Sequence, residues 1–327
     1  MMEQFKALMV DKNENDFSVQ VKNITLNELP QGDVLIKVSY SAINYKDGLA
    51  SIPNGKIVTT YPFIPGIDLA GVVVSSQDPR FREGDEIIAT SYEIGVSHYG
   101  GYSEYARIPG DWIVPLPENL TLMESMILGT AGITSALSIQ RLEDNGLSPE
   151  KGKVLVTGAT GGVGSLAVSM LSKRGYEVVA STGKNSEHTF LHKLGAKEII
   201  SREDVFNGKI KTLDKQNWAA AVDPVGGETL ASILSKIQYN GSVAVSGGGS
   251  VPTTVFPFIL RGINLLGIDS VYCPMDVRQE LWNRMATDLK PSTLSEIIQK
   301  EITLEELPEN LPTILKGQER GRIIVKI

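Results

Sequence analysis

A glycine-rich turn that follows a short apolar strand restricts the possible folds of this chain more than any other segment. Residues 153–167 read Lys-Val-Leu-Val-Thr-Gly-Ala-Thr-Gly-Gly-Val-Gly-Ser-Leu-Ala, so an apolar strand runs into the turn and an amphipathic helix runs out of it. Gly162-x-Gly164-x-x-Ala167 matches the fingerprint of dinucleotide-binding turns, whose last position takes glycine or alanine. Glycine is needed there because side chains would keep a pyrophosphate away from the backbone N–H groups. The N-terminus of the helix adds a favourable partial charge.

The turn therefore predicts a dinucleotide site. The expected contacts are Thr160, Gly161, Gly162, Val163 and Gly164. The alternative is a tight structural turn between a strand and a helix that binds nothing. The strand before the turn, the helix after it and a second strand at the right distance favour the dinucleotide.

The second strand of this region selects the kind of dinucleotide. NAD-binding folds usually end that strand with an acidic residue about 20 positions after the glycines. Here Ser181, Thr182, Gly183 and Lys184 stand at the strand end, without the acid. A carboxylate would repel a 2′-phosphate, whereas these hydroxyls and the lysine could bind one, and Arg202 after the third strand could add a second cation. We therefore predict NADP(H); the alternative for Lys184 is an ordinary exposed loop lysine.

The length of 327 residues is too great for one ordinary core and indicates two domains. Short β-prone runs separated by turn residues fill the first 110 residues and predict a β-barrel-like domain. From about residue 120 onward, strands alternate with helices, which predicts a parallel, doubly wound sheet. The early strands are expected at 4–10, 17–23, 33–41, 66–75, 85–90 and 102–108.

The alternating region begins with an expected helix at 120–137. Its expected strands are 153–157, 177–181, 198–201, 218–223, 242–246 and 264–268, and its helices are 164–174 and 186–194. Further helices are expected at 276–288 and 293–299. The chain closes on an expected strand at 321–327, which could return to the β-rich region and make the first domain discontinuous.

Composition argues against several kinds of partner. The net charge of −7 lacks the basic footprint of nucleic-acid binding, so we expect no nucleic-acid partner. The longest apolar runs are too short to span a bilayer, and no basic segment followed by an apolar stretch opens the chain. We therefore expect no membrane contact and a cytoplasmic location. The single cysteine, Cys273, excludes an internal disulfide and a multi-cysteine metal site.

Several segments occur together in an order that is typical of one protein family. They are Ser41-Ala-Ile-Asn-Tyr-Lys-Asp47, Pro65-Gly-Ile-Asp-Leu-Ala-Gly71, Leu128-Gly-Thr-Ala-Gly-Ile-Thr134, Val156-Thr-Gly-Ala-Thr-Gly-Gly-Val-Gly164 and Asp223-Pro-Val-Gly-Gly227. Over nearly its whole length the chain thus resembles the medium-chain dehydrogenase/reductase superfamily. Asn44-Tyr-Lys-Asp47, Asp78-Pro-Arg-Phe81, Gly110-Asp-Trp112 and Pro252-Thr-Thr-x-x-Pro-Phe-Ile-Leu-Arg261 resemble, more narrowly, its quinone-oxidoreductase-like branch, which includes bacterial acrylyl-CoA reductases.

The resemblance implies an α/β protein with two domains. A GroES-like β-barrel domain would comprise residues 1–124 and 266–327, and a Rossmann doubly wound parallel sheet domain would comprise residues 125–265. NADPH would be the cofactor, and a homodimer is often formed. The implied reaction is the reduction of a carbon–carbon double bond conjugated to a carbonyl, on a small molecule such as an enoyl-CoA, an enone or a quinone.

Zinc-dependent members of the superfamily carry a cysteine early in the barrel and then a Gly-His-Glu segment. Here the first position falls in Asn-Tyr-Lys-Asp at 44–47, and the second reads Gly-Ile-Asp at 66–68. His188 and His192 are four residues apart on an expected helix, and we interpret them as exposed surface. Because catalytic zinc needs three protein ligands, we expect no metal.

The resemblance also implies roles for residues outside the glycine turn. Asn44 and Tyr45 follow an early strand and would lie near the nicotinamide as catalytic residues, with Tyr45 orienting the cofactor or donating a proton or hydrogen bond. The alternative for Tyr45 is a packed barrel tyrosine, and Lys46 and Asp47 could be an ordinary loop pair. Further cofactor contacts are expected at Thr130, Thr134, Gly247, Ser270 and Gln318. The run that contains Gly247 could equally be a plain flexible loop.

The leading functional hypothesis is an NADPH-dependent enoyl reductase without metal, with acrylyl-CoA, which would yield propionyl-CoA, as one candidate substrate. Conjugate reduction suits a zinc-free site because hydrogen-bond donors can stabilise the enolate oxygen. The alternative within the same class is an NADPH-dependent quinone oxidoreductase. A third hypothesis, a non-enzymatic structural or RNA-binding protein, is disfavoured by the acidic charge and the intact cofactor turn.

Overall fold

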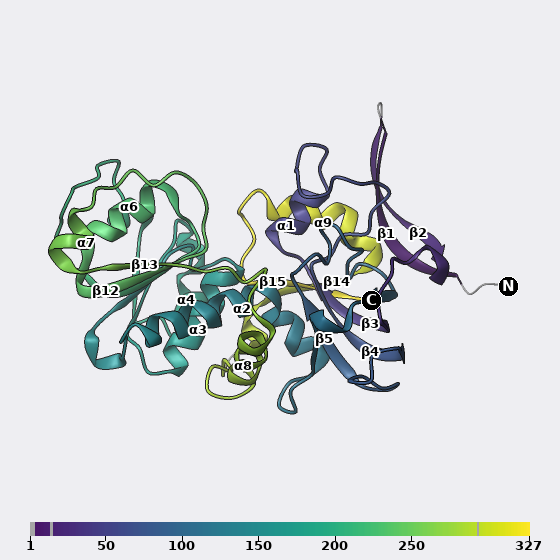
Figure 1. Cartoon of the computed structure of the whole chain (residues 1–327). Coiled ribbons are helices and arrows are strands. Elements are labelled where there is room, and N and C mark those ends of the chain that lie inside the picture. Colours follow the sequence, from purple (N-terminus) through teal and green to yellow (C-terminus); the bar gives the residue numbers. More distant parts are fainter. Residues whose placement is uncertain (1–3, 14–15, 293) are drawn as a thin grey trace. The chain divides into compact units, whose positions relative to one another are not determined.

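The computed structural model describes residues 4–13, 16–292 and 294–327, and the chain divides into two compact units (Figure 1). The first unit comprises Met1–Thr130, Val271–Glu280 and Ile298–Ile327. The second comprises Ala131–Ser270 and Leu281–Ile297. The division differs from the domain boundaries expected above chiefly at residues 281–297, which lie in the second unit.

The first unit is built on a seven-stranded sheet and a separate two-stranded hairpin. The sheet order is β14 (Ile298–Thr303), β15 (Arg322–Lys326), β3 (Val34–Ala42), β4 (Asp68–Ser76), β5 (Glu86–Thr90) and β7 (Ile113–Pro115), with β6 (Tyr105–Ile108) also paired to β3. The hairpin joins β1 (Gln4–Lys12) and β2 (Phe17–Thr25) in antiparallel register. Helices α1 (Tyr45–Ala50) and α9 (Leu307–Ile314) pack together so closely that a Cβ on Gly48 would lie 2.5 Å from Cγ2 of Ile314.

The strand expected at 321–327 does return to the β-rich region. β15 pairs antiparallel with β3, so that Val325 lies opposite Ser41, and the first unit is discontinuous in sequence. The helix expected at 293–299 is wrong at its end. Residues 294–297 form a short 3-10 turn, and Ile298 begins β14, which pairs parallel with β15. Residue 293 lies outside the described part of the chain.

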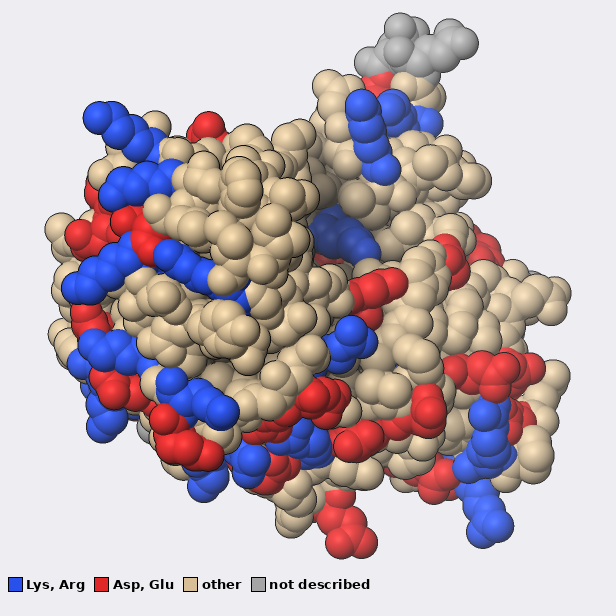
Figure 2. Space-filling model, turned by 60° about the vertical axis from the view of Figure 1, so that its left-hand side comes forward, with Lys and Arg blue, Asp and Glu red and all other residues tan. Residues whose placement is uncertain are grey.

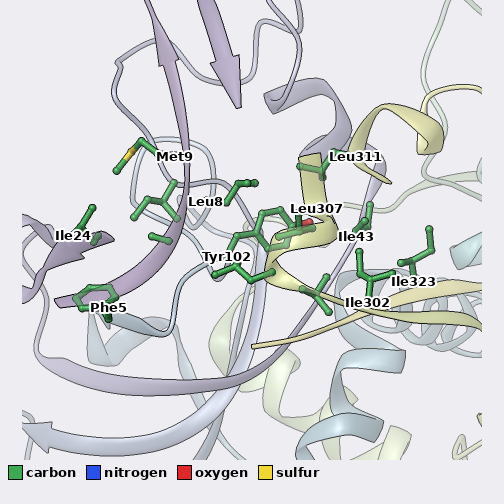
Figure 3. Close-up of a cluster of buried hydrophobic side chains, with 14 of the residues drawn as sticks. Phe5, Leu8, Met9, Ile24, Ile43, Tyr102, Ile302, Leu307, Leu311 and Ile323 are labelled. Atoms are coloured by element: carbon green, nitrogen blue, oxygen red, sulfur yellow. The ribbon is translucent and has the colours of Figure 1, made fainter. Parts of the chain in front are cut away.

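Early and late segments share one hydrophobic core in the first unit. Figure 3 shows apolar side chains of β1 and β2 converging with side chains of α9 and β15. Its buried members include Phe5, Leu8, Ile24, Ile43, Tyr102, Leu307, Leu311 and Ile323. Removing this much apolar surface from water is the main favourable contribution to such a fold, so the late segment is an integral part of the first unit.

The second unit contains a six-stranded sheet in which every neighbouring pair is parallel. The order is β10 (Glu198–Ile200), β9 (Val178–Ser181), β8 (Val154–Val156), β11 (Trp218–Asp223), β12 (Ile237–Val245) and β13 (Asn264–Gly267). Numbered within this sheet, the order is 3-2-1-4-5-6, which is that of the doubly wound dinucleotide-binding fold. The predicted fold class is confirmed. The helices of this unit are α3 (Gly162–Lys173), α4 (His188–Lys193), α5 (Arg202–Val205), α6 (Gly227–Lys236) and α7 (Phe256–Arg261).

Two helices pass from one unit into the other, namely α2 (Leu122–Asp144) and α8 (Met275–Ala286). By length and composition alone α2 could cross a membrane, which corrects the expectation that every apolar run is too short. However, 78% of its most apolar window is buried inside the protein. Burial in the core therefore accounts for the composition of α2, whose apolar residues are interspersed with glycine, serine and threonine.

Candidate functional site

The glycine turn connects the end of β8 to the start of α3, as expected. Gly158 has φ +52°, a backbone conformation that favours glycine. A Cβ on Gly164 would lie 2.3 Å from the carbonyl oxygen of Gly158, so no side chain fits there. The N-cap residue of α3 is Gly161, which has no side chain to accept hydrogen bonds from the first turn of the helix. The turn is therefore shaped to receive a phosphate on backbone N–H groups.

The residues expected at the adenosine end come together beside β9. Ser181 and Thr182 are buried, and Oγ1 of Thr182 accepts a hydrogen bond of 3.0 Å from the backbone N–H of Lys184. Gly183 is exposed, and a Cβ built on it would lie 2.9 Å from Nε of Arg202. The Arg202 side chain therefore lies across Gly183, so the turn presents a guanidinium and a lysine without an acidic residue.

The other expected contacts in the second unit lie along the same carboxyl edge of its sheet. Oγ1 of Thr134 donates a hydrogen bond of 2.8 Å to Oγ of Ser270, and both residues are buried. Gly247 follows β12, and a Cβ on it would lie 2.4 Å from the carbonyl carbon of Val225. That close approach of two backbones constrains the loop that contains Gly247.

Sequence reasoning missed Asp223 as a site residue. It ends β11, is fully buried, and accepts hydrogen bonds from the Thr157 hydroxyl and from the N–H groups of Val225 and Gly226 at 3.1 and 3.0 Å. Burial raises the pKa of the Asp223 carboxyl, and these hydrogen bonds oppose the rise. The sequence feature that could have identified Asp223 is a carboxylate at the end of a strand that is otherwise entirely apolar.

A second buried carboxylate organises the first unit. Asp68 accepts hydrogen bonds from Nδ2 of Asn44 at 2.8 Å and from Oγ1 of Thr130 at 2.5 Å, and the backbone N–H of Thr130 lies 3.1 Å from both of its oxygens. Arg322 completes the cluster, because its Nη1 donates to Oδ1 of Asn44 at 3.0 Å. All of these side chains are buried or half-buried, so the Asn44 amide is bonded at both ends.

The kink at Gly129 makes this arrangement possible. Gly129 departs from helical geometry inside α2, with φ +51°. The break turns the N–H of the following residue, Thr130, toward the Asp68 carboxylate. A Cβ on Gly129 would lie 2.5 Å from Oδ2 of Asp68, so only glycine fits. Asp68 therefore receives the positive end of the helix segment that begins at Thr130.

Ser91 was also missed. Its hydroxyl lies 3.0 Å from that of Thr130, and because Thr130 donates its one hydroxyl proton to Asp68, Ser91 donates to Thr130. Ser91 and Tyr92 have φ +65° and +48°, two successive left-handed residues that are not glycine. Such strain persists only where surrounding contacts hold it, here next to the Asp68 cluster.

Asp47 is not half of an ordinary loop pair, and that expectation was wrong. It is fully buried and accepts hydrogen bonds from the backbone N–H of Asn44 at 2.8 Å and of Ile67 at 2.9 Å. Burial, together with the nearby Asp68 carboxylate, raises the pKa of Asp47 to about 6. The sequence signal was the capping-box spacing from Asn44 to Asp47.

Tyr45 is not a packed barrel tyrosine, because its side chain is 60% exposed at the start of α1. Gln318 is exposed in the segment before β15. His188 and His192 are exposed on α4, as interpreted from their spacing. Within residues 4–13, 16–292 and 294–327, there is no group of three His, Cys, Asp or Glu side chains arranged to hold a metal ion.

Comparisons with known proteins agree with this fold and turn. The family described as "Alcohol dehydrogenase GroES-like domain" matches residues 30–118, and "Zinc-binding dehydrogenase" matches residues 162–287. Over 99% of both chains, the sequence is 65% identical to "Putative quinone oxidoreductase YhfP" of Bacillus subtilis and 46% identical to "Acrylyl-CoA reductase AcuI" of Ruegeria pomeroyi.

Two solved structures are similar over nearly their whole length. Bacillus subtilis yhfP with NAD bound, at 65% identity, gives a TM-score of 0.98 over 99% of this chain and 100% of that one. The yhdH oxidoreductase of Salmonella enterica in complex with NADP, at 44% identity, gives 0.95 over 98% and 99%. Together with these relatives, the strand order and the glycine turn identify a nicotinamide-dependent oxidoreductase. The chain belongs to the medium-chain dehydrogenase/reductase superfamily, in its quinone-oxidoreductase-like branch.

Proposed function

We propose that this chain uses NADPH to reduce a carbon–carbon double bond conjugated to a carbonyl, and that acrylyl-CoA, giving propionyl-CoA, is its first candidate substrate. The observation that carries the choice of NADPH is the acid-free, basic end of β9 beside a glycine turn without room for a side chain at Gly164. The 46% identity to an acrylyl-CoA reductase supports the substrate.

The choice of NADPH over NADH depends on Lys184 and Arg202. A cation at each side of Gly183 would neutralise a 2′-phosphate, which NADH lacks. The comparison of NADPH with NADH matters because a relative that is 65% identical was solved with NAD bound. Lys184→Ala and Arg202→Ala should each weaken NADPH much more than NADH in a fluorescence titration. Equal losses for the two nucleotides would contradict the assignment.

The bound nicotinamide would supply hydride to the β-carbon of the substrate, and the chain must then stabilise the enolate and let a proton reach the α-carbon. Tyr45 offers an exposed hydroxyl that can donate a hydrogen bond or a proton. The preceding residue, Asn44, is fixed by Asp68 and Arg322, so it holds the start of α1 in place. Tyr45→Phe should lower kcat while leaving the dissociation constant of NADPH nearly unchanged. An unchanged kcat would exclude the hydroxyl from the reaction.

Quinone reduction is the second candidate, and the name of the Bacillus subtilis relative favours it. Steady-state turnover of acrylyl-CoA and of a small quinone, both with NADPH, distinguishes the two. We expect a higher kcat/KM for acrylyl-CoA. Inactivity on acrylyl-CoA with good quinone turnover would reverse the order of the candidates.

A non-enzymatic RNA-binding role has little support. On the face shown in Figure 2, basic and acidic side chains are interspersed, whereas nucleic-acid binding usually relies on a basic patch or stripe. We propose instead a cytoplasmic enzyme whose partner is a small molecule. A gel shift with RNA at physiological salt should show no complex, and a tight complex would overturn this part of the proposal.

We also propose that two copies associate through the second unit. β13 is an edge strand of its sheet, and Leu265 on it is 41% exposed. On α7, Ile259 and Leu260 are 66% and 56% exposed. Exposed apolar side chains at a sheet edge are typical of an interaction surface. Sedimentation equilibrium should give a dimer that Ile259→Lys dissociates; a monomeric wild type would refute this.

A further inference from the structure

The Asp223 carboxylate is a buried acceptor that joins two segments of the cofactor-binding edge. Thr157, directly after β8, donates its hydroxyl to Oδ1, and Val225 and Gly226 donate their N–H groups to Oδ1 and Oδ2. The side chain is fully buried, and each of these donors is neutral. A buried carboxylate without a cation is costly, so its hydrogen bonds must hold the donors firmly in place.

The backbone carbonyl of the same residue joins a third segment. It accepts hydrogen bonds from the N–H groups of Ser246 at 3.1 Å and Gly247 at 3.3 Å, directly after β12. The loops after β11 and β12 then lie backbone to backbone, since a Cβ on Gly226 would fall 2.3 Å from the carbonyl oxygen of Gly248. One residue thereby ties together the loops that follow β8, β11 and β12.

These loops lie at the point where the strand order of the sheet reverses. β8 is flanked by β9 on one side and by β11 on the other. In this fold a dinucleotide lies across that point, with one mononucleotide half on each side. Residues 181–184, which are suited to a 2′-phosphate, lie at the end of β9 and so on one side of β8. The loops after β11 and β12 lie on the other side and therefore face the nicotinamide half.

The loop after β11 also lies against the glycine turn. A Cβ built on Gly158 would fall 3.4 Å from Cγ2 of Val225 and 3.6 Å from Cγ of Pro224. Val225 is 47% exposed, so it borders the turn rather than the core. A shift of the loop after β11 would therefore reach the turn that receives the pyrophosphate.

We propose that Asp223 is a positioning residue for the nicotinamide half of the cofactor, acting through the loops after β8, β11 and β12. This inference rests on the proposed use of NADPH. It predicts that loss of the carboxylate weakens the nicotinamide half of the site selectively and leaves the adenosine half intact.

The test compares two probes on Asp223→Asn. NADPH occupies both halves of the site, whereas adenosine 2′-monophosphate carries only the adenosine and the 2′-phosphate and places no phosphate on the glycine turn. The variant keeps the size of the side chain but turns an amide N–H₂ toward at least one donor. The dissociation constant of NADPH should rise by about tenfold, and that of the monophosphate should change by less than about twofold, both by isothermal titration. Asp144→Asn, at an exposed position of the same unit, should change neither.

Thr157→Val supplies a second variant in case Asp223→Asn does not fold. It removes one donor with little change of volume and should weaken NADPH in the same selective way, by a smaller factor. Equal weakening of both probes by either variant would show a merely structural role and overturn the inference. Unchanged affinity for both probes would overturn it as well. A wild-type protein that does not bind NADPH would instead defeat the proposed function on which it rests.

Discussion

Nη2 of Arg322 lies 3.6 Å from Oδ2 of Asp68, and the two side chains are 3% and 0% exposed. The guanidinium also donates to the carbonyl oxygens of Ile127 and Ile43 at 3.1 and 3.2 Å. Opposite charges that are both removed from water stabilise each other only as a pair, because each alone bears the full cost of desolvation.

Arg322→Met should therefore lower the free energy of unfolding by about 3–5 kcal/mol, since it leaves the Asp68 carboxylate buried without its cation. Urea denaturation measures the loss. Lys6→Met removes a cation from the exposed pair Lys6–Glu305, whose side chains are both 52% exposed, and should cost far less. Similar losses for the two variants would contradict a special role for the buried pair.

Gly129→Ala should destabilise the protein through two separate effects. A left-handed φ costs an alanine about 1–2 kcal/mol, and the new Cβ would also crowd Asp68 and Nη2 of Arg322. Gly146→Ala is the matched control, because its φ is +86° and no atom lies within 4 Å of the position that the new methyl would take. Gly129→Ala should exceed this control by about 1–3 kcal/mol in urea denaturation. Equal costs would show that the contact with Asp68 can relax.

Protonation of Asp47 should make the free energy of unfolding depend on pH. Its carboxyl has a pKa of about 6 in the folded protein against an ordinary value of 3.8, so the folded state binds the proton more tightly. This contribution to stability is complete below pH 3.8 and is lost as the pH rises through about 6. Relative to Asp47→Asn, the wild type should gain roughly 2.4 kcal/mol between pH 7 and pH 4. Parallel pH profiles of the two proteins would refute the shift.

Gly183→Ala should change cofactor selectivity without changing stability. The new methyl would press on the flexible side chain of Arg202, which can move aside at little cost. The dissociation constant of NADPH should then rise by about fivefold while that of NADH stays constant. In an Arg202→Ala background, the same substitution should add nothing. An additional loss in that background would show that Gly183 acts by another route.

Local patterns in the sequence predicted the second unit well. The strand before the glycine turn, the turn itself and the alternation of strands and helices each depend on neighbouring residues, and these features lie where they were expected. The strand β14 escaped prediction because its partner is β15, which lies about 20 residues further along the chain. Its sequence Ile-Gln-Lys-Glu-Ile-Thr is equally compatible with a helix.

The buried polar cluster of the first unit was less accessible to sequence reasoning. Asn44 was singled out, but nothing local indicates that Arg322, in a strand whose two charged residues flank an apolar run, turns inward. Its burial depends on Asp68 and on the pairing of β15 with β3, which are contacts across the whole chain. For Asp47, a local capping pattern was present, but Asp47 was interpreted as part of an ordinary loop pair. The functional roles of Tyr45, Lys184 and Gln318 stay predictions.

The placement of β15 between β14 and β3 has a consequence for biosynthesis. Arg322 leaves the ribosome some 250 residues after Asp68. At typical elongation rates of about 5–20 residues per second, Arg322 is synthesised roughly 10–50 s after Asp68. During that interval residues 131–270 have already been made and can collapse into their own sheet. The second unit can therefore fold before the first unit, although the first unit contains the residues that are made earliest. Until β15 is made, the early strands form an incomplete sheet with the Asp68 carboxylate unpaired with its cation, and chaperones would encounter them in that state.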